Sequence, residues 1–212
     1  MINKKGIQDS ALQLVTRQLP TGSYSINNVS PEREALKGMT EKAILNVLKQ
    51  FDWTFAQKRD VLKADKIYTT DEDKLKDNPN RYIKDYFGWK SKYKLPNNYI
   101  GCLVIYNSQW ENLESYTNSD NPMWWVEGKY VLTKTYARDD KINISYTYYD
   151  TNELTLPTPV ELCIIYHLAH LIAPALIGSF ETSERYYNFY LRTLLEAKTL
   201  DARERVPIVA NR

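Results

Sequence analysis

The sequence contains little glycine, and neither sign of charge is in clear excess. Seven glycines in 212 residues leave little room for the glycine-rich loops that cradle phosphates in nucleotide-binding proteins. Basic and acidic side chains number 28 and 26, for a net charge of +2, whereas a dedicated nucleic-acid binder usually carries a basic excess. The composition therefore argues against a nucleotide-binding enzyme and against a DNA clamp, but it is compatible with a local basic stripe.

Cysteine is also scarce, and no leader-like segment stands at the start. The two cysteines, Cys102 and Cys163, lie in apolar surroundings and far apart in the sequence. We expect buried free thiols rather than a disulfide, which fits a reducing cytoplasm. Residues 1–14 have no long apolar run behind their lysines, unlike a signal peptide. The sequence thus predicts a protein that is made and kept inside a cell, or that leaves it by lysis.

The last quarter of the chain predicts two helices folded back on each other. One helix is expected over 158–177 and the other over 182–203, with a reversal at Ile177-Gly178-Ser179. The first is apolar on almost every side, so it must be buried all round or lie in a membrane. Its uncharged run between Glu161 and Gly178 is shorter than the roughly 20 apolar residues of a membrane span, and it contains two histidines. We therefore expect burial within protein, with cover from the N-terminal helices, a sheet or neighbouring subunits.

Local signals mark the ends and faces of these two helices. Thr158 and Glu161 are spaced as a capping box across Pro159, and Gly178 is expected to end the first helix. One face of the second helix is expected to carry Tyr187, Tyr190, Leu191 and Leu194.

Two more helices are predicted at the start of the chain, over about 8–19 and 30–51. The first is expected to end before Pro20. Ser30 caps the second, whose apolar residues recur at spacings of three and four. The second is therefore predicted as an amphipathic helix with one buried face.

The middle of the chain, about 58–156, predicts a β lobe. A strand is expected near 58–62, followed by an exposed, charged excursion over 69–94 and a polar loop over 107–121. Apolar and polar residues alternate over 142–148, which predicts a strand with one buried face. Because helices, strands and helices follow in separate runs, the sequence indicates the α+β class. We expect the N- and C-terminal helices to form a bundle, with an antiparallel β-sheet or hairpin lobe inserted.

Residues able to carry chemistry are few. His167 and His170 share a helical face at a spacing that can hold a metal, but no third ligand lies on that helix, and zinc sites need three or four ligands. We expect both rings to fill a tight core and to form local hydrogen bonds. The Asp71-Glu72-Asp73 run lacks the alternating ligands and the glycine of a calcium loop, so we expect a solvated loop. The sequence therefore predicts no metal, no cofactor and no catalytic centre.

Aromatic residues offer two binding hypotheses. There are 17 tyrosines against five phenylalanines, and tyrosine suits half-buried strands and wet interfaces. A hairpin is predicted from residues 123–126 and 129–135, which flank the turn signal Glu127-Gly128. Trp124 and Trp125 are neighbours on its first strand, so one packs inward while the other can face out as a binding residue. A set that could stack against nucleic acid consists of Tyr146, Tyr148 and Tyr149 with Lys141.

Several segments follow one another in a recognisable order. They are Phe51-Asp52-Trp53-Thr54-Phe55-Ala56-Gln57-Lys58-Arg59; Trp89 and then Tyr93-Lys94-Leu95-Pro96-Asn97-Asn98-Tyr99; Trp125 to Thr133; Ile142 to Tyr149; and Pro159 to Arg205. In this order they resemble the head-to-tail adaptor proteins of tailed bacteriophages, of the kind called tail tubular protein A. The sequence departs from the family pattern at Asn98, where the family often has aspartate, and in the stretch before Ser30.

The resemblance implies a structural protein of the virion neck or tail, assembled in the host cytoplasm, and not an enzyme. Residues 1–212 would form a single adaptor domain. By the resemblance, about twelve copies would form a ring under the portal protein and join it to the tail tube or nozzle protein. The ring would extend the channel through which genomic DNA passes without specific binding. No cofactor and no membrane are implied.

The expected protein interfaces are the C-terminal arm and the hairpin tryptophans. The arm, residues 206–212, carries apolar side chains beyond the last helix that need a host surface, which we expect to be the portal. The predicted interface residues are Val206, Pro207, Ile208, Val209, Trp124 and Trp125.

Two other functions stay open. A tail-associated glycan hydrolase needs two carboxylates about 5 to 10 Å apart, for which Glu127, Asp139 and Asp140 are candidates by proximity. A nucleic-acid-binding module would use the tyrosine-rich sheet.

Overall fold

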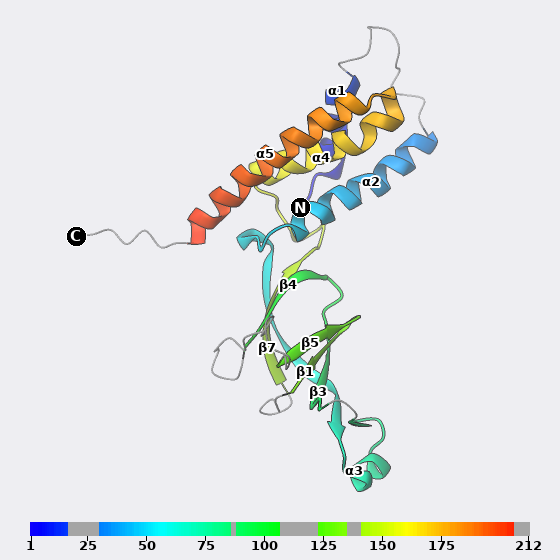
Figure 1. Ribbon diagram of the computed structural model, residues 1–212, viewed down its shortest axis with the longest axis vertical. Coiled ribbons are helices and arrows are strands. Elements are labelled where there is room, and N and C mark those ends of the chain that lie inside the picture. The colour runs from blue at the N-terminus through cyan, green and yellow to red at the C-terminus, as the bar shows by residue number, and fades with distance from the viewer. Residues whose placement is uncertain (17–29, 86–87, 107–122, 135–140, 206–212) are drawn as a thin grey trace, which may run out of the picture. The chain divides into compact units, whose positions relative to one another are not determined.

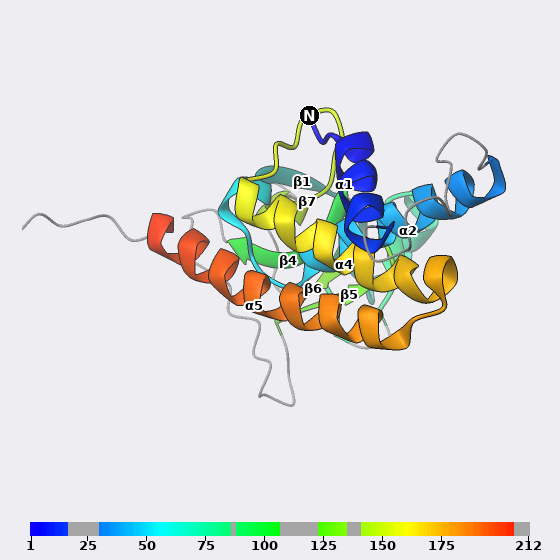
Figure 2. The ribbon, with the colours of Figure 1, turned by 90° about the horizontal axis from the view of Figure 1, so that it is seen from above.

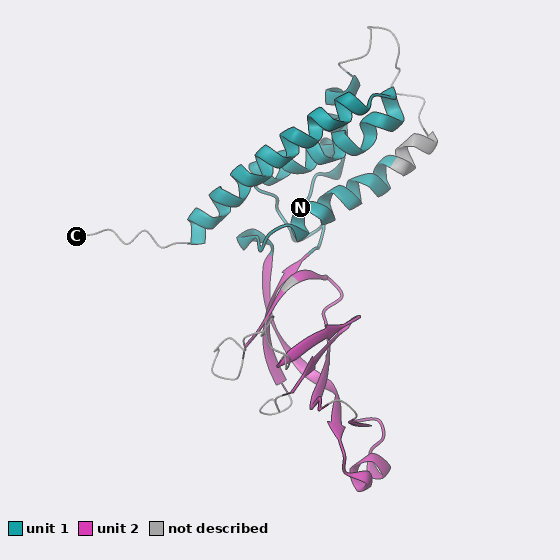
Figure 3. Cartoon of the chain, viewed as in Figure 1, with its two compact units in different colours: residues 1–56, 149–212 teal, residues 57–148 magenta. Residues whose placement is uncertain are grey.

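A computed structural model of the chain describes residues 1–16, 30–85, 88–106, 123–134 and 141–205 (Figure 1). These residues are a mixture of helix and sheet, with a curled, mainly antiparallel sheet and two C-terminal helices, in agreement with the predicted α+β class. The chain divides into two compact units (Figure 3). Unit 1 comprises residues 1–56 and 149–212, and unit 2 comprises residues 57–148.

Unit 1 is helical. Its elements are α1 (Lys4–Thr16), α2 (Ser30–Lys49), the short 3-10 helix η2 (Thr54–Ala56), α4 (Thr158–Ile177) and α5 (Phe180–Arg205). Helix α4 contacts α1, α2 and α5, and Figure 2 shows it between α1 and α5. The core of unit 1 forms where their apolar faces meet, around residues such as Ile7, Ile44, Leu48, Ile164 and Leu168.

The bounds predicted for α4 are confirmed at both ends, but its N-terminal cap differs from the prediction. Pro157 occupies the capping position and makes no side-chain hydrogen bond; the Glu161 amide instead donates to the Pro157 carbonyl over 3.0 Å. The predicted capping box is therefore wrong, because Thr158 already lies inside the helix. Gly178 ends α4 as expected, with a left-handed φ of 62° that favours glycine.

The packing of α4 bears on whether this helix crosses a membrane or lies in a protein core. Among the described residues, α4 alone is long and apolar enough to cross a membrane, a test that the core helix of a soluble protein also passes. Its contacts with three other helices bury residues along its length, including Val160, Ile164, Leu168 and Ile172. This packing supports the interpretation of α4 as a core helix.

Three other helix predictions were right in kind and wrong in extent. Helix α1 (Lys4–Thr16) begins four residues before the predicted 8–19, because the Asn3 side chain accepts a hydrogen bond from the Gly6 amide (2.9 Å) and so caps an earlier start. The predicted end at residue 19 lies outside the described residues. Helix α2 ends at Lys49, two residues before the prediction. Helix α5 extends the predicted 182–203 by two residues at each end.

Unit 2 is built on one curled sheet. Its strands are β1 (Gln57–Thr69), β2 (Tyr82–Lys84), β3 (Ser91–Lys94), β4 (Tyr99–Tyr106), β5 (Trp124–Glu127), β6 (Tyr130–Thr133) and β7 (Lys141–Tyr148). The order is β4-β7-β1-β3-β6-β5, and β2 pairs in parallel with β1. The first half of β1 pairs with β7 and the second half with β3, with a register shift between Ala64 and Lys66. Such a bulge bends a strand, which fits the curl of the sheet.

The core of unit 2 lies on one face of these strands. It is formed by Leu62, Tyr93, Leu95, Ile105, Val131, Ile142, Ile144 and Tyr146. The prediction of a single buried face for 142–148 is wrong, because Ser145 and Thr147 are buried as well. Strand β7 lies between β4 and β1, so the short Ser145 and Thr147 side chains are flanked by residues of both neighbouring strands.

The region predicted as an exposed excursion, 69–94, is more ordered than expected. It contains helix α3 (Glu72–Asp77) and strands β2 and β3. Asp71 starts α3, since its side chain accepts hydrogen bonds from the Asp73 and Lys74 amides. The strand expected near 58–62 is in fact the 13-residue β1. The loop predicted at 107–121 lies outside the described residues.

Candidate functional site

Helix α5 carries apolar side chains on two faces. One face packs in the core of unit 1 through Tyr186, Tyr190, Leu194 and Ala197, and α4 is the main neighbour of α5. A second set is exposed, which we call the α5 stripe: Phe180 (79% exposed), Tyr187 (40%), Leu191 (44%) and Leu195 (68%). The last three are four residues apart, so they align along one side of the helix. Exposed apolar side chains aligned in this way can form an interaction surface.

The four residues predicted on one face of this helix lie at the border between its buried and its exposed side. Of the four residues expected together, Tyr190 and Leu194 are buried, whereas Tyr187 and Leu191 belong to the exposed stripe. Periodicity alone cannot decide which of two apolar faces is buried. The recurrence of Tyr187, Leu191 and Leu195 at intervals of four was the available sequence signal for the stripe.

A layer of aromatic rings and histidines joins α4 to α5 behind the stripe. The His167 ring stacks on Tyr190 with ring centres 4.6 Å apart, and the His170 ring lies 4.9 Å from that of Tyr187. The Ser183 hydroxyl donates to the His170 backbone carbonyl (2.9 Å) and lies 2.9 Å from Nδ1 of the same histidine. Tyr187 thus belongs to the stripe and also contacts this layer, which ties the exposed face to the core.

His167 is the most perturbed titratable group in this layer. It is buried, and its Nε2 lies 3.2 Å from the Asn46 amide nitrogen. Burial first, and the charge of His170 second, lower the pKa of His167 to about 4. The ring is therefore neutral near pH 7. The expected burial of the His167 ring is confirmed, but its hydrogen-bond partner Asn46 belongs to α2 rather than to the neighbouring sequence, and its buried Nδ1 has no partner among the described residues.

The described residues also bear on the expectations for metal and thiol chemistry. Among them, no group of three or more His, Cys, Asp or Glu side chains is placed to hold a metal ion. Cys163 is a buried free thiol as predicted, and burial raises its pKa to about 12, so the thiol stays protonated. The side chain of Cys102 lies outside the described set.

A buried carboxylate fixes the far end of α5. Asp201 accepts hydrogen bonds from the Thr54 amide (2.9 Å) and the Thr54 hydroxyl (2.7 Å). Arg205 donates to Asp201 (3.2 Å) and to Asp52 (3.3 Å), and its guanidinium lies over the Phe51 ring. These contacts, which we call the Asp201 clamp, hold the last turn of the helix directly before residue 206.

The structure places only part of the predicted interface set. Trp124 packs against the core of unit 2, whereas its neighbour Trp125 is 58% exposed. Trp125 is therefore the member of the pair that faces out, as alternation along a strand requires. Val206, Pro207, Ile208 and Val209 lie outside the described residues.

The residues named for the two other functions are not brought together by the described part of the fold. Glu127 is exposed on β5, while Asp139 and Asp140 lie outside the described residues. Tyr146 is buried, and its hydroxyl donates to Asn98 over 3.2 Å. Tyr146 therefore cannot serve in a stacking platform with Tyr148, which corrects the predicted tyrosine set.

Comparison with known proteins assigns the chain to no family. No protein-family model matches the chain, and no curated protein matches it in sequence.

Proposed function

We propose that the chain is a structural ring-forming adaptor of the phage head-to-tail kind, and not an enzyme. The α5 stripe is the observation that carries this proposal, because a ring needs a large apolar contact between neighbouring copies. A stable contact of this type buries more than about 1,000 Å² and has an apolar centre. The stripe supplies the apolar centre on one copy, and a different surface of the next copy would cover it.

This arrangement is a heterologous contact, in which each subunit uses two different surfaces. Repeated by rotation, the contact closes into a ring, which we expect to hold about twelve copies. We propose that the helices of unit 1, as a bundle, form the ring wall and that the inserted β lobe of unit 2 faces the tail tube or nozzle protein. Residues 206–212 would dock as an arm on the portal. In the virion neck, such a ring extends the channel for genomic DNA.

The near balance of charge supports a conduit rather than a clamp. Strong contacts to DNA phosphates would hold a duplex in a salt-dependent way and hinder its passage. We therefore expect no tight, salt-sensitive binding of duplex DNA by the free protein.

The test places one charge in the stripe and the same charge on the opposite side of α5. Leu191 and Leu200 are 44% and 45% exposed, and nine residues of helix put them about 180° apart. The protein is mixed with the portal from the same genome and imaged for an added ring. We expect Leu191→Glu to abolish the ring and Leu200→Glu to preserve it, with circular dichroism confirming that both variants fold.

Two results would contradict the proposal. One is the absence of an added ring with the wild-type protein. The other is equal ring assembly by Leu191→Glu and by the wild type, which would show that the stripe is not the contact between copies.

A further inference from the structure

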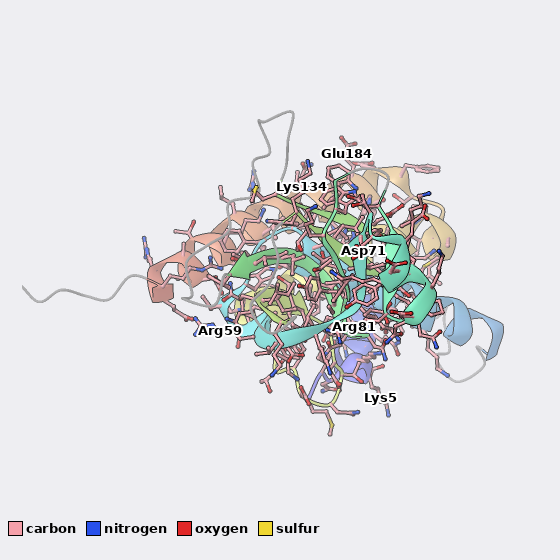
Figure 4. All side chains as sticks on the ribbon, turned by 90° about the horizontal axis from the view of Figure 1, so that it is seen from below. Lys5, Arg59, Asp71, Arg81, Lys134 and Glu184 are labelled. Atoms are coloured by element: carbon pink, nitrogen blue, oxygen red, sulfur yellow. The ribbon has the colours of Figure 1, made fainter. Side chains whose placement is uncertain are left out.

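Unit 2 contains an open pocket of about 500 Å³ with a basic lining. Its polar residues are Lys63, Asp65, Asn78, Asn80, Arg81 and Lys141, all of them exposed to solvent. They come from β1, from the segment that follows α3 and from the first residue of β7. Figure 4 labels Arg81 close to α3. Three cationic side chains and one carboxylate give the pocket a local charge of about +2.

Two of the cations are placed against each other. Lys63 and Lys141 are directly opposite in the ladder between β1 and β7. Side chains at such positions are about 5 Å apart at Cβ, and like charges there destabilise the sheet. An anion bound between them would turn this repulsion into attraction.

The third cation, Arg81, lies on a backbone segment that is hydrogen-bonded to β1. The Ile67 amide donates to the Arg81 carbonyl (2.8 Å), and the Tyr82 amide donates to the Asn78 carbonyl (3.1 Å). Lys66 donates to the Asn80 carbonyl, which ties the same segment to β1. The backbone that carries Arg81 is therefore fixed to β1, whereas the charged side chains of the pocket are exposed.

We propose that this pocket binds a phosphate group, a property that goes beyond the adaptor role. Arg81 offers a planar fork of N–H donors, the two lysines offer mobile point charges, and Asn78 and Asn80 add amide donors. A single arginine can satisfy a planar carboxylate, whereas cations arriving from three segments suit the tetrahedral oxygens of phosphate. The phosphate can be a free anion or part of a nucleic-acid backbone, since both present the same chemistry.

The first experiment is a titration of the isotopically labelled full chain with sodium phosphate at constant ionic strength, followed by amide chemical shifts. We expect saturable shifts at the pocket residues of β1 and β7. The double variant Lys63→Gln/Lys141→Gln should weaken binding about tenfold or more, because two charge-assisted contacts are lost. Lys129→Gln is the matched control: it removes one exposed lysine from the turn between β5 and β6, outside the pocket, and should leave the affinity unchanged.

Thermal melting provides a second measurement on the same proteins. Without phosphate, the double variant should be at least as stable as the wild type, because the opposed charges are gone. The wild type and Lys129→Gln should gain more melting temperature than the double variant when the same phosphate concentration is added. Absence of saturable shifts up to about 50 mM phosphate would overturn the proposal. So would shifts confined to other residues, or an equal loss of affinity in Lys129→Gln.

A competition experiment distinguishes the sources of the phosphate. A single-stranded oligonucleotide of about 12 nucleotides that binds more tightly than phosphate, and is displaced by it, identifies a nucleic-acid backbone as the ligand. Phosphate binding without competition from the oligonucleotide identifies the free anion. If a short polyglutamate peptide displaces phosphate and the oligonucleotide does not, the pocket serves a carboxylate partner and the proposal fails. None of these outcomes depends on ring assembly.

Discussion

Replacing His167 with glutamine should remove a defined part of the pH dependence of stability. In the folded protein, burial lowers the pKa of His167 to about 4, whereas a histidine in an unfolded chain titrates near its ordinary value of 6.5. Both states hold a neutral ring above pH 6.5, so the group does not affect stability there. As the pH falls from 6.5 towards 4, His167 becomes protonated in the unfolded chain but stays neutral in the folded protein. Stability is therefore lost across this window.

The magnitude follows from the two pKa values. Each pH unit between them costs about 1.4 kcal/mol. Between about pH 7.5 and about pH 5, the loss due to this one group is about 2 kcal/mol. Glutamine is neutral at every pH, so His167→Gln should lose about 2 kcal/mol less than the wild type over the same interval.

The assay is urea unfolding followed by the helical band of the circular dichroism spectrum, because unit 1 contains the long helices. Carboxylates also titrate at the acidic end, but they are the same in both proteins and cancel in the difference. A lower absolute stability of the variant does not affect the comparison. If His167→Gln shows the same loss between the two pH values as the wild type, the ring is not the neutral buried group described above.

The other predictions concern the Asp201 clamp at the end of α5 and the arm, residues 206–212, that follows it. Asp201→Ala should destabilise unit 1 by about 2–4 kcal/mol in urea unfolding, because both Thr54 donors lose their acceptor. Arg205→Ala removes a more exposed partner and should cost less than about 1 kcal/mol. Equal losses of stability in the two variants would contradict the role assigned to the carboxylate. Deleting residues 206–212 should abolish binding to the portal in a pull-down while leaving the circular dichroism spectrum unchanged, and retained binding would reject the arm.

Elements with strong local signals could be predicted from the sequence. The bounds of α4 follow from its apolar run, its prolines and Gly178, which needs no information from elsewhere in the chain. The hairpin of β5 and β6 follows likewise from Gly128, whose φ of 60° suits the turn. The start of α1 was missed because the cap at Asn3 is a single side-chain contact ahead of two lysines, which are unfavourable at a helix start.

Strand β1 was underestimated for a different reason. Its residues 57–69 are mostly charged or polar and carry no regular apolar alternation, so its length is set by pairing with β7 and β3 rather than by its own sequence. The phosphate pocket depends on the same long-range pairing, because Lys63 and Lys141 meet only once the register of β1 and β7 is fixed. The Asp201 clamp also joins residues distant in sequence, so no local sequence pattern predicts it.

The attachment of α5 at both ends suits the role in assembly that we propose for its exposed stripe. At its start, the Ser179 hydroxyl accepts a hydrogen bond from the Thr182 amide (3.1 Å), and one turn later Ser183 joins the helix to His170. At its end, the Asp201 clamp holds the last turn. A helix fixed at both ends presents its leucines without further ordering, and association then costs less conformational entropy. Weakening the clamp should therefore impair assembly even though Asp201 lies outside the stripe, because the same apolar side chains would be presented from a looser helix.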